Sequence, residues 1–265
     1  MAVRKRPARR AARGAPGQHF LRSSRLAADL VRDAGVEAGD LVVDVGAGTG
    51  ALTHALAAAR ARVVALELDP VLASELRRRF SEREVDVVEA DAREYRWPES
   101  PFAVVANLPF AGSRDILSRL LGDPRVPLRR ADAIVQWEAA VKHAAVWPAT
   151  LKGVLWGAWY ELAVTTRISR TAFSPPPAVD AGVLRALRRP EPLVEACEFA
   201  RYARFVADGF RAQRPLRIAL RAHLTPRELK RLAPVLGFGV DALPRDLGAR
   251  QWAGLFELAR DRGRV

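Results

Sequence analysis

Short apolar runs recur along the first half of the chain, with helical patterns between several of them. They cover residues 41–45, 62–68, 85–90, 102–107 and 132–137 and are rich in Val and Ala. Such continuous runs are typical of strands that are buried on both faces. Because these strands alternate with helical stretches, the pattern predicts an α/β domain whose parallel sheet carries helices on both faces.

A helix is expected before the first of these strands. Ser23 or Ser24 can cap it, the stretch "RLAADLVRDAG" carries its pattern, and Gly35 can end it. The strand at 41–45 then leads into a glycine turn and the helical stretch "ALTHALAAA". Together these segments predict a strand–turn–helix unit at the start of the sheet.

The pattern changes at Pro190, and no strand is predicted beyond it. The stretch "RRPEPL" has the composition of a linker, and several short helices follow. These helices are expected to break at Pro215, Pro226, Pro234 and Pro244. The 265 residues are thus expected to form a flexible basic arm at 1–14, a sheet domain at 15–189 and a small all-α domain at 190–265.

The charge balance adds a polyanionic partner to this picture. The net charge is +13, the sequence pI is about 11.1, and only four of the 43 basic residues are lysine. A GC-rich genome explains the preference for arginine over lysine, but it does not explain the excess of base over acid. Since arginine pairs well with phosphate, nucleic acid is the leading partner.

The arm "MAVRKRPARRAARG" is the most basic segment. It has six basic residues by position 13 and, unlike a secretory signal, no apolar core. Its lack of acids also fits a transit peptide, but an arm that gathers RNA phosphates is the simpler interpretation. A solvated helix face is the alternative for each single arginine outside the arm. The candidate RNA-binding residues are Arg4, Arg6, Arg9 and Arg10 in the arm and Arg211, Arg214, Arg217 and Arg221 in the helical domain.

Composition disfavours several other classes of protein. Cys197 is the single cysteine, so no intrachain disulfide forms, and no Cys/His cluster has the spacing of a metal site. No apolar segment reaches the roughly 18 residues that a membrane span needs. We therefore expect a soluble cytoplasmic protein without a bound metal.

The glycine turn supplies the first candidate for ligand binding. Gly46, Gly48 and Gly50 follow the first strand directly, and glycine permits a tight turn and close approach to a ligand. Alone this signal is weak, because Gly46-x-Gly48-x-x-Ala51 also fits the dinucleotide-binding fingerprint.

Polar side chains at other strand ends strengthen this candidate. Glu67 ends the second strand and can accept both hydroxyls of a ribose, and Asp91 follows the third and can accept from an adenine amine. A solvated acid at a strand end is the alternative for each. Ligands of open α/β sheets lie across the carboxyl ends of the strands, so these two residues, together with Gly46 and Asn107, predict a nucleoside site.

The stretch "VANLPF" at 105–110 adds a reactive feature to that site. An exocyclic base amine is a poor nucleophile because its lone pair is delocalised into the ring. The Asn107 side-chain carbonyl and the Leu108 main-chain carbonyl, held extended before Pro109, can accept its two N–H groups and favour a pyramidal amine. Phe110 offers a ring on which a base can stack, worth roughly 1–3 kcal/mol. The alternative is a strand-ending turn with an incidental Phe.

These residues carry a family resemblance. The motifs "GQHFL", "VDVGAGTGALT", "LELD", "EADARE", "VANLPF" and "TAFSPPPAVDAGVL" stand in the order and at the intervals of the ribosomal RNA adenine N6-methyltransferases, over about residues 17–189. The chain resembles the Erm type, which methylates large-subunit RNA and confers macrolide, lincosamide and streptogramin B resistance, more than the small-subunit dimethylases. The stretch "VQWEAAVKHA" favours the Erm type, and the Tyr-Gly-x-Leu-Ser segment of the small-subunit branch is missing.

The resemblance implies a class I S-adenosylmethionine-dependent methyltransferase fold, Rossmann-like with a seven-stranded mostly parallel sheet, and S-adenosylmethionine as cofactor. His19 stands where the family usually has Asn, and Phe110 where it often has Tyr. The residues at cofactor positions are Gln18, His19, Leu21, Gly46, Gly48, Glu67, Leu68, Asp91, Ala92 and Asn107. Those at target-base positions are Asn107, Leu108, Pro109, Phe110 and Phe173, with Phe173 expected to form the second wall of a clamp around a flipped adenine.

The reaction that the resemblance implies is methyl transfer to N6 of a specific unpaired adenine in the peptidyl transferase loop of 23S rRNA, by a monomer that acts before the ribosome is fully assembled. A small-subunit dimethylase is the nearest alternative. An NAD-dependent hydride transferase explains the glycines and Glu67 but leaves Asn107 to Phe110 without a role. A non-catalytic RNA-binding factor would be expected to have lost the glycine turn or Asn107.

Overall fold

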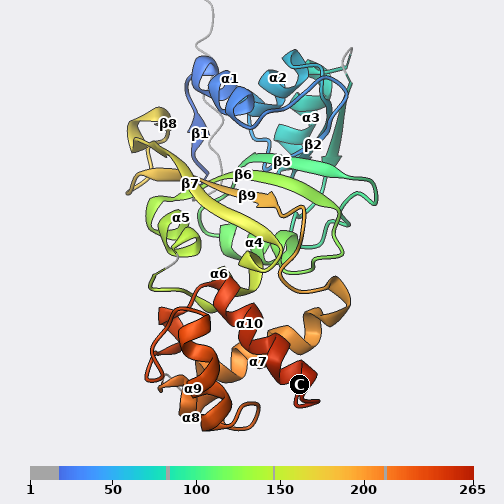
Figure 1. The fold of residues 1–265 in the computed structure, drawn as a ribbon. Coiled ribbons are helices and arrows are strands. Elements are labelled where there is room, and N and C mark those ends of the chain that lie inside the picture. Colours follow the sequence, from blue (N-terminus) through green and yellow to red (C-terminus); the bar gives the residue numbers. More distant parts are fainter. Residues whose placement is uncertain (1–17, 82–83, 146, 212–213) are drawn as a thin grey trace, which may run out of the picture.

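The computed structural model describes residues 18–81, 84–145, 147–211 and 214–265, and its centre is a seven-stranded sheet (Figure 1). The strands along the chain are β2 (Leu41–Val45), β3 (Arg62–Glu67), β4 (Val85–Glu89), β5 (Phe102–Asn107), β6 (Leu128–Gln136), β7 (Tyr160–Ile168) and β9 (Ala181–Arg188). Their order in the sheet is β4-β3-β2-β5-β6-β9-β7. Neighbours from β4 to β6 are parallel, whereas β9 is antiparallel to both β6 and β7, which confirms the mostly parallel sheet.

The apolar pattern located five of these strands and missed two. β6 begins at Leu128, four residues before the predicted start, and the other four begin where the pattern placed them. β7 and β9 were predicted only as members of a seven-stranded sheet. β7 lies at the edge of the sheet, where its side chains alternate between buried or half-buried and exposed positions, so it lacks the continuous apolar run of a central strand.

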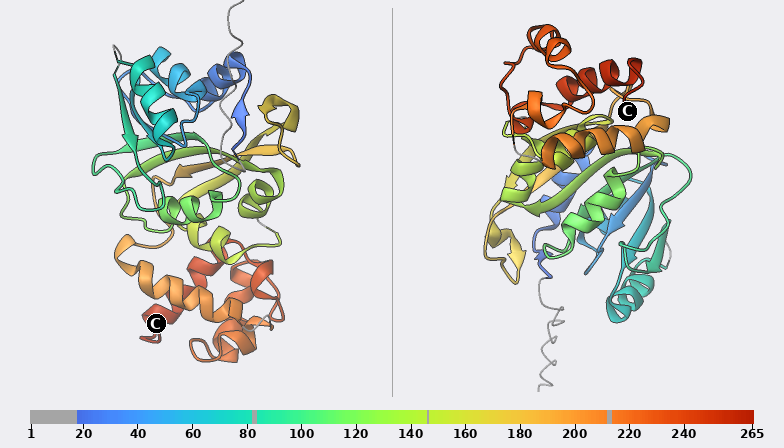
Figure 2. Two further views of the ribbon diagram at one scale, coloured as in Figure 1. Left: turned by 180° about the vertical axis from the view of Figure 1, so that it is seen from behind. Right: turned by 90° about the horizontal axis from the view of Figure 1, so that it is seen from below.

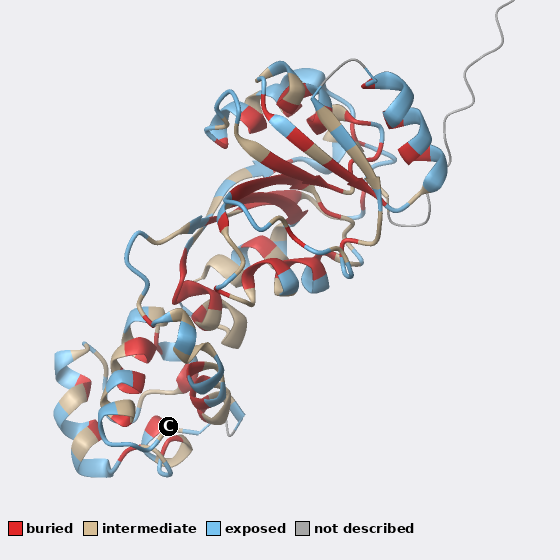
Figure 3. Ribbon diagram, turned by 90° about the vertical axis from the view of Figure 1, so that its right-hand side faces the viewer, coloured by how far each residue is buried: buried red, intermediate tan, exposed pale blue. Residues whose placement is uncertain are grey.

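Helices cover both faces of the sheet (Figure 2). They are α1 (Ser24–Asp33), α2 (Ala51–Ala58), α3 (Pro70–Arg79), α4 (Ser113–Leu121), α5 (Trp137–Ala144) and α6 (Leu151–Gly157). Because successive strand residues face opposite sides, Val42 and Val105 pack with α1 and α2, whereas Val43 and Val104 pack with α4. The central strands are buried along almost their whole length (Figure 3).

The first helix begins and ends as predicted. The Ser23 hydroxyl accepts the Leu26 N–H at 3.2 Å and caps α1, and Gly35 follows its end with φ +61°. Just before α1, the short strand β1 (Phe20–Leu21) pairs antiparallel with β8 (Phe173–Ser174), which follows the 3₁₀ turn η1 (Arg170–Ala172). This ladder joins two segments that are far apart in the sequence.

After Pro190 every regular element of the described part of the chain is a helix, as predicted. Its elements are η2 (Ala196–Glu198), α7 (Phe199–Arg211), α8 (Leu216–Ala219), α9 (Pro226–Val235), η3 (Pro244–Asp246) and α10 (Ala249–Asp261). Pro226 and Pro244 each occupy the first turn of an element, where a proline costs no hydrogen bond. The predicted break at Pro234 was wrong, because Pro234 lies inside the last turn of α9.

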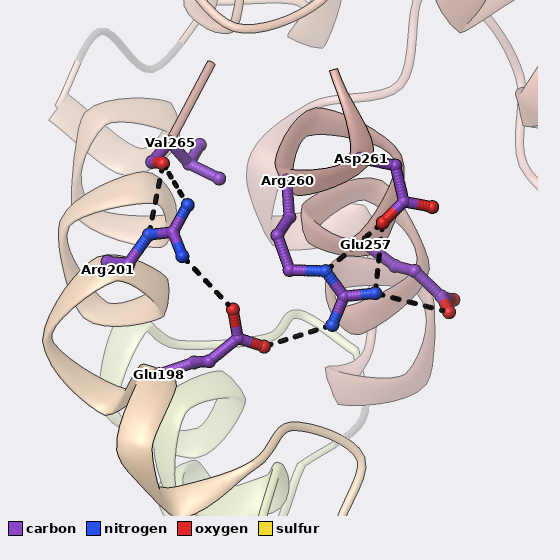
Figure 4. A network of polar contacts seen from close by, with 6 residues as sticks. All are labelled: Glu198, Arg201, Glu257, Arg260, Asp261 and Val265. Carbon is purple, nitrogen blue, oxygen red and sulfur yellow. Dashed lines mark hydrogen bonds and ion pairs between the residues drawn. The ribbon is translucent and has the colours of Figure 1, made fainter. Parts of the chain in front are cut away.

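Ion pairs and aromatic contacts fix these helices. Glu198 accepts from Arg201 on α7 at 3.3 Å and from Arg260 on α10 at 3.0 Å, and Arg201 also donates to the main-chain oxygen of Val265 (Figure 4). Trp159, directly before β7, packs edge-to-face against Tyr202 with ring centroids 5.8 Å apart. The helical part therefore shares a continuous apolar core with the sheet.

Candidate active site

A cavity of about 330 Å³ opens at the carboxyl ends of the parallel strands, large enough for a small organic ligand. Its walls come from the segment before β1, the turn after β2, the ends of β3 and β4, and the loop after β5. Most of the residues proposed from the sequence lie here: Gln18, His19, Gly46, Gly48, Glu67, Leu68, Asp91, Ala92, Asn107, Leu108, Pro109 and Phe110. Leu21 and Phe173 are buried beside the cavity and do not line it.

Glu67 is fixed by main-chain groups rather than solvated. Its Oε2 accepts the Gly48 N–H at 2.7 Å, its Oε1 accepts the Asp69 N–H at 2.9 Å, and the residue is 3% exposed. A buried carboxylate held by two N–H groups keeps further lone pairs for a ligand in the cavity. The alternative of a solvated acid at the strand end is therefore wrong for this residue.

The glycine turn keeps the cavity open toward that carboxylate. The N–H groups of Gly46 and Ala47 both donate to the Leu66 carbonyl at 2.9 Å, so the turn is tied to the end of β3. Gly48 has φ +56°, and a Cβ on it would lie 2.8 Å from the Phe20 ring. The close packing of β1 on the turn therefore requires glycine at this position.

Asn107 presents an acceptor that no group of a described residue fills. Its Nδ2 donates to the main-chain oxygen of His19 at 2.6 Å, which fixes the orientation of the amide. Its Oδ1 is buried and has no hydrogen-bond partner among the described residues. A buried carbonyl left without a donor costs roughly 1–3 kcal/mol, so this atom is suited to a donor that arrives with a ligand.

Two aromatic rings stand beside this amide. The Phe110 ring lies 5.3 Å from the His19 ring and 6.4 Å from the Phe173 ring, and the two phenyl planes meet at 69°. Phe110 is half-buried, whereas Phe173 is fully buried. The structure thus brings the predicted pair together through the β1–β8 ladder, but it places them edge-to-face and not as two parallel walls.

His19 contributes through its main chain and its ring. Its ring Nδ1 lies 2.8 Å from the Pro175 carbonyl, and its main-chain oxygen accepts from Asn107. The segment before β1 is therefore attached both to the loop after β8 and to the end of β5. The imidazole thus supplies the link to the loop after β8, whereas the main chain of His19 supplies the link to β5.

Asp91 has a partner that the sequence did not reveal. Arg93 donates from Nη2 to Asp91 Oδ2 at 2.6 Å and from its main-chain N–H to Oδ1 at 2.8 Å. The side-chain hydrogen bond from Arg93 lowers the pKa of Asp91, so its carboxylate stays ionised. The same aspartate-x-arginine arrangement recurs at Asp123 and Arg125, and this spacing is the signal that could have identified the pair.

A second carboxyl group lies behind the glycine turn. Asp44 in β2 is buried and accepts the Thr53 hydroxyl at 2.7 Å through its Oδ2. Burial raises the pKa of Asp44 to about 7, with a smaller contribution from the charge of Glu67. The carboxyl group is therefore partly protonated near neutral pH, which limits the negative charge around the cavity.

The candidate RNA-binding arginines of the helical domain differ in their surroundings. Arg211 lies 3.4 Å from Asp208, and Arg217 lies 2.7 Å from Asp241. Arg214 and Arg221 are exposed and take part in no ion pair with a described residue. Arg4, Arg6, Arg9 and Arg10 lie outside the described residues.

Within the described part of the chain, no helix is long and apolar enough to cross a membrane. Over the same residues, no group of three His, Cys, Asp or Glu side chains is arranged to hold a metal ion.

A seven-stranded sheet with a glycine turn, a strand-end glutamate and a cavity at its carboxyl edge defines the class I methyltransferase fold. The family model for ribosomal RNA adenine dimethylases matches residues 10–254. The chain therefore belongs to the ribosomal RNA adenine dimethylase family and is a methyltransferase. This membership overturns the alternative of an NAD-dependent hydride transferase.

Relatives from both branches of the family are similar to the chain. The mycinamicin-resistance protein MyrB of Micromonospora griseorubida is 35% identical over 93% of this chain and 79% of its own length. The ribosomal RNA small subunit methyltransferase A of Thermosynechococcus vestitus is 32% identical over 92% of this chain and 95% of its own length. The crystal structure of the 23S rRNA methyltransferase ErmE superposes with a TM-score of 0.80 at 29% identity, over 91% of this chain and 99% of that one.

Proposed function

We propose that the protein transfers a methyl group from S-adenosylmethionine to N6 of a specific unpaired adenine in the peptidyl transferase loop of 23S rRNA. Such methylation gives resistance to macrolide, lincosamide and streptogramin B antibiotics. The observation that carries the chemistry is the unfilled Asn107 Oδ1, buried at the end of β5 beside the half-buried Phe110 ring. A flat base with an exocyclic amine fits both features, because its amine can donate to Asn107 Oδ1 and its ring can stack on Phe110.

The cavity residues suit the cofactor. The Glu67 carboxylate faces the glycine turn and would accept from ribose hydroxyls, and the exposed Leu68 side chain beside it would offer an apolar surface to a purine. Asp91 and Ala92 lie at the next strand end, where they would face the purine edge. S-adenosylmethionine would supply the methyl group on a positively charged sulfur, so the protein's own contribution is binding and orientation.

The protein groups near Asn107 then act on the amine. Asn107 Oδ1 and the Leu108 carbonyl would accept the two N–H groups of the target adenine, which turns its lone pair toward the cavity. Phe110 would hold the base by stacking. Alignment of this kind lowers the activation free energy of a bimolecular reaction by roughly 7–11 kcal/mol. Because the amine becomes acidic only after it has attacked, this arrangement requires no general base beside Asn107.

The large-subunit branch is favoured by two similarities. MyrB has the higher identity of the two relatives, at 35% against 32%, and ErmE matches the fold over 91% of the chain. We infer that the substrate is RNA that is not yet fully assembled into ribosomes, since the target base must be reached and flipped. We also infer a monomer that acts in the cytoplasm, where ribosomal RNA is available.

Mapping of the modified nucleotide tests this proposal. Ribosomal RNA from cells with and without the gene is analysed by primer extension and by mass spectrometry of nuclease fragments. We expect new N6-methylated adenosine in the peptidyl transferase loop of the large-subunit RNA, together with macrolide resistance. Modification confined to small-subunit RNA would replace this assignment by the small-subunit alternative. The absence of any modification would favour a non-catalytic RNA-binding factor.

A further inference from the structure

An exposed tryptophan lies where the sheet meets the C-terminal helices. Trp147, between α5 and α6, is 71% exposed, and its Nε1 donates to Asp246 Oδ1 of η3 at 3.2 Å. Two residues further on, the Ala149 N–H donates to the Arg245 carbonyl at 2.7 Å. The indole is thus held at its edge while most of its surface stays in water, which is an arrangement suited to stacking.

Exposed cations lie on the elements next to this ring. Lys142 in the last turn of α5, Arg245 in η3 and Arg250 at the start of α10 are all exposed. None of the three takes part in an ion pair with a described residue. The acids on these elements are Glu138, one turn before Lys142, Asp246, which accepts from the indole, and Glu257 and Asp261, two and three turns beyond Arg250 on α10. The charge of this surface is therefore positive.

A second cavity lies next to this surface, close to where β7 begins and β9 ends. Behind α5, this cavity of about 470 Å³ is lined by residues that include His143, Arg189 and Arg250. Burial, together with the smaller effect of the nearby charges of Lys152, Lys142 and Arg114, lowers the pKa of His143 to about 4. Arg114 lies in the first turn of α4, four residues after Phe110. The charges of Arg114, Lys142 and Lys152 all act on His143, so cations of α4, α5 and α6 lie near one another between the target-base loop and the tryptophan, whereas Arg189 is paired with Glu161.

The path between the two places is short. Asn107 at the end of β5 pairs with Ile134 of β6, and β6 leads directly into α5. Since α5 has 8 residues, its far end lies roughly 12 Å from that edge of the sheet. In Figure 1, α5 lies between the sheet and the C-terminal helices, on the side of β1 and β8. Nucleotides next to a base at Phe110 would therefore pass close to Trp147.

We propose that Trp147 stacks an unpaired base of the RNA strand that flanks the target adenine, while Lys142, Arg245 and Arg250 contact its phosphates. The proposal rests on the proposed function, because it takes the RNA as the partner. Stacking on an aromatic ring combined with a cationic track is how proteins hold single strands without reading their sequence. Trp147 would then position the strand, and the groups around Asn107 would carry out the chemistry.

The test uses the full chain and short RNA hairpins whose loop contains the target adenine. In separate hairpins, 2-aminopurine replaces a loop nucleotide on either side of the target, because its fluorescence falls when it stacks on a ring. We expect Trp147→Ala to weaken hairpin binding roughly 5- to 100-fold and to abolish the quenching at one flanking position. Trp147→Phe should restore both, and S-adenosylhomocysteine affinity should stay unchanged in each variant.

Matched controls separate stacking from general effects. Arg250→Ala should weaken hairpin binding and reduce the salt dependence of that binding. Arg78 is an exposed arginine on α3 without an ion pair to a described residue, and Arg78→Ala should change neither quantity. Unchanged binding and quenching in Trp147→Ala, with a wild-type protein that methylates the hairpin, would overturn this inference alone. A wild-type protein that neither binds nor methylates the hairpin would overturn the proposed function as well. A dimer that only Trp147→Ala dissociates would show that the ring contacts a second copy instead of RNA.

Discussion

At Gly48 two constraints meet in one residue. The backbone has φ +56°, a conformation that costs other residues roughly 1–2 kcal/mol, and a Cβ would lie 2.8 Å from the Phe20 ring. Its N–H also donates to Glu67. The position therefore couples the backbone of the turn, the packing of β1 and the orientation of the Glu67 carboxylate.

The first prediction separates these effects with two alanine substitutions. Gly39 also has a left-handed backbone, at φ +85°, but a Cβ on it would meet no described atom within 4 Å. Gly39→Ala should lower the free energy of unfolding by roughly 1 kcal/mol and leave S-adenosylhomocysteine binding unchanged. Gly48→Ala should lower the free energy of unfolding by more than this and should weaken S-adenosylhomocysteine binding at least about 10-fold, because β1 and Glu67 must shift. Denaturant unfolding and calorimetry measure both; equal effects of the two substitutions would contradict the role of the Phe20 contact.

Asp44 gives the second prediction, which concerns pH. Its pKa is raised from 3.8 to about 7 in the folded protein, mainly by burial. The folded state therefore binds more protons than the unfolded state between roughly pH 4 and pH 7, and this contribution to stability falls as the pH rises through that window. Asp44→Asn removes the titration, so the difference in unfolding free energy between wild type and variant should decline across the window and level off above it. A difference that is independent of pH would contradict the raised pKa.

At the scale of elements, the β1–β8 ladder determines how the site is assembled. It pairs Phe20 with Ser174 and Leu21 with Phe173. The main-chain oxygen of His19, just before this ladder, accepts from Asn107, and the Phe173 ring lies edge-to-face against Phe110. Neither strand is longer than two residues. The active-site geometry thus depends on a small ladder that the N-terminal motif and the "FSPPP" loop form together.

The third prediction distinguishes the two rings of this ladder region. Phe110→Ala should reduce methyl transfer to an RNA hairpin roughly 5- to 100-fold through lost stacking, with little change in stability. Phe173→Ala should instead lower the free energy of unfolding by roughly 3–5 kcal/mol, because the ring is fully buried. Phe110→Tyr keeps the ring and should keep the activity. Equal losses of stability in Phe110→Ala and Phe173→Ala would contradict this division of roles.

Much of the fold could be predicted because the central strands are uninterrupted apolar runs. β2 and β5 match the predicted 41–45 and 102–107, and the cavity collects residues from the strand ends that the topology rule indicated. Edge strand β7 escaped the pattern because its side chains alternate between the core and water. The Arg93 contact and the edge-to-face angle at Phe173 depend on side-chain packing across distant segments, which no periodicity records.

At the scale of the whole molecule, positive charge is unevenly available. Several arginines of the helical domain are tied to acids, as Arg201 and Arg260 are to Glu198. The exposed cations without such pairs to described residues include Arg114 on α4, Lys142 on α5 and Arg250 on α10. Arg214 and Arg221 of the helical domain are also exposed and without an ion pair to a described residue, so we expect the RNA to be held by both groups of cations and by the basic arm.

The fourth prediction concerns the arm. Residues 1–14 contain six basic side chains, and each phosphate contact that they make releases counterions. Deleting the arm should weaken hairpin binding at low salt and flatten the plot of log affinity against log salt by roughly 0.7 for each lost contact. S-adenosylhomocysteine binding should stay the same. An unchanged salt slope would show that the arm does not contact RNA.

The central claim is that the amide at the end of β5 receives the amine of an adenine. Single-turnover transfer of a radiolabelled methyl group to the RNA hairpin, by wild type and by Asn107→Ala, tests it most directly, with calorimetry of S-adenosylhomocysteine as the control for cofactor binding. We predict that Asn107→Ala slows transfer by roughly 10²- to 10³-fold, the cost of losing one preorganised polar group, while cofactor binding remains measurable. Methyl transfer at the wild-type rate by the Asn107→Ala protein would contradict the account.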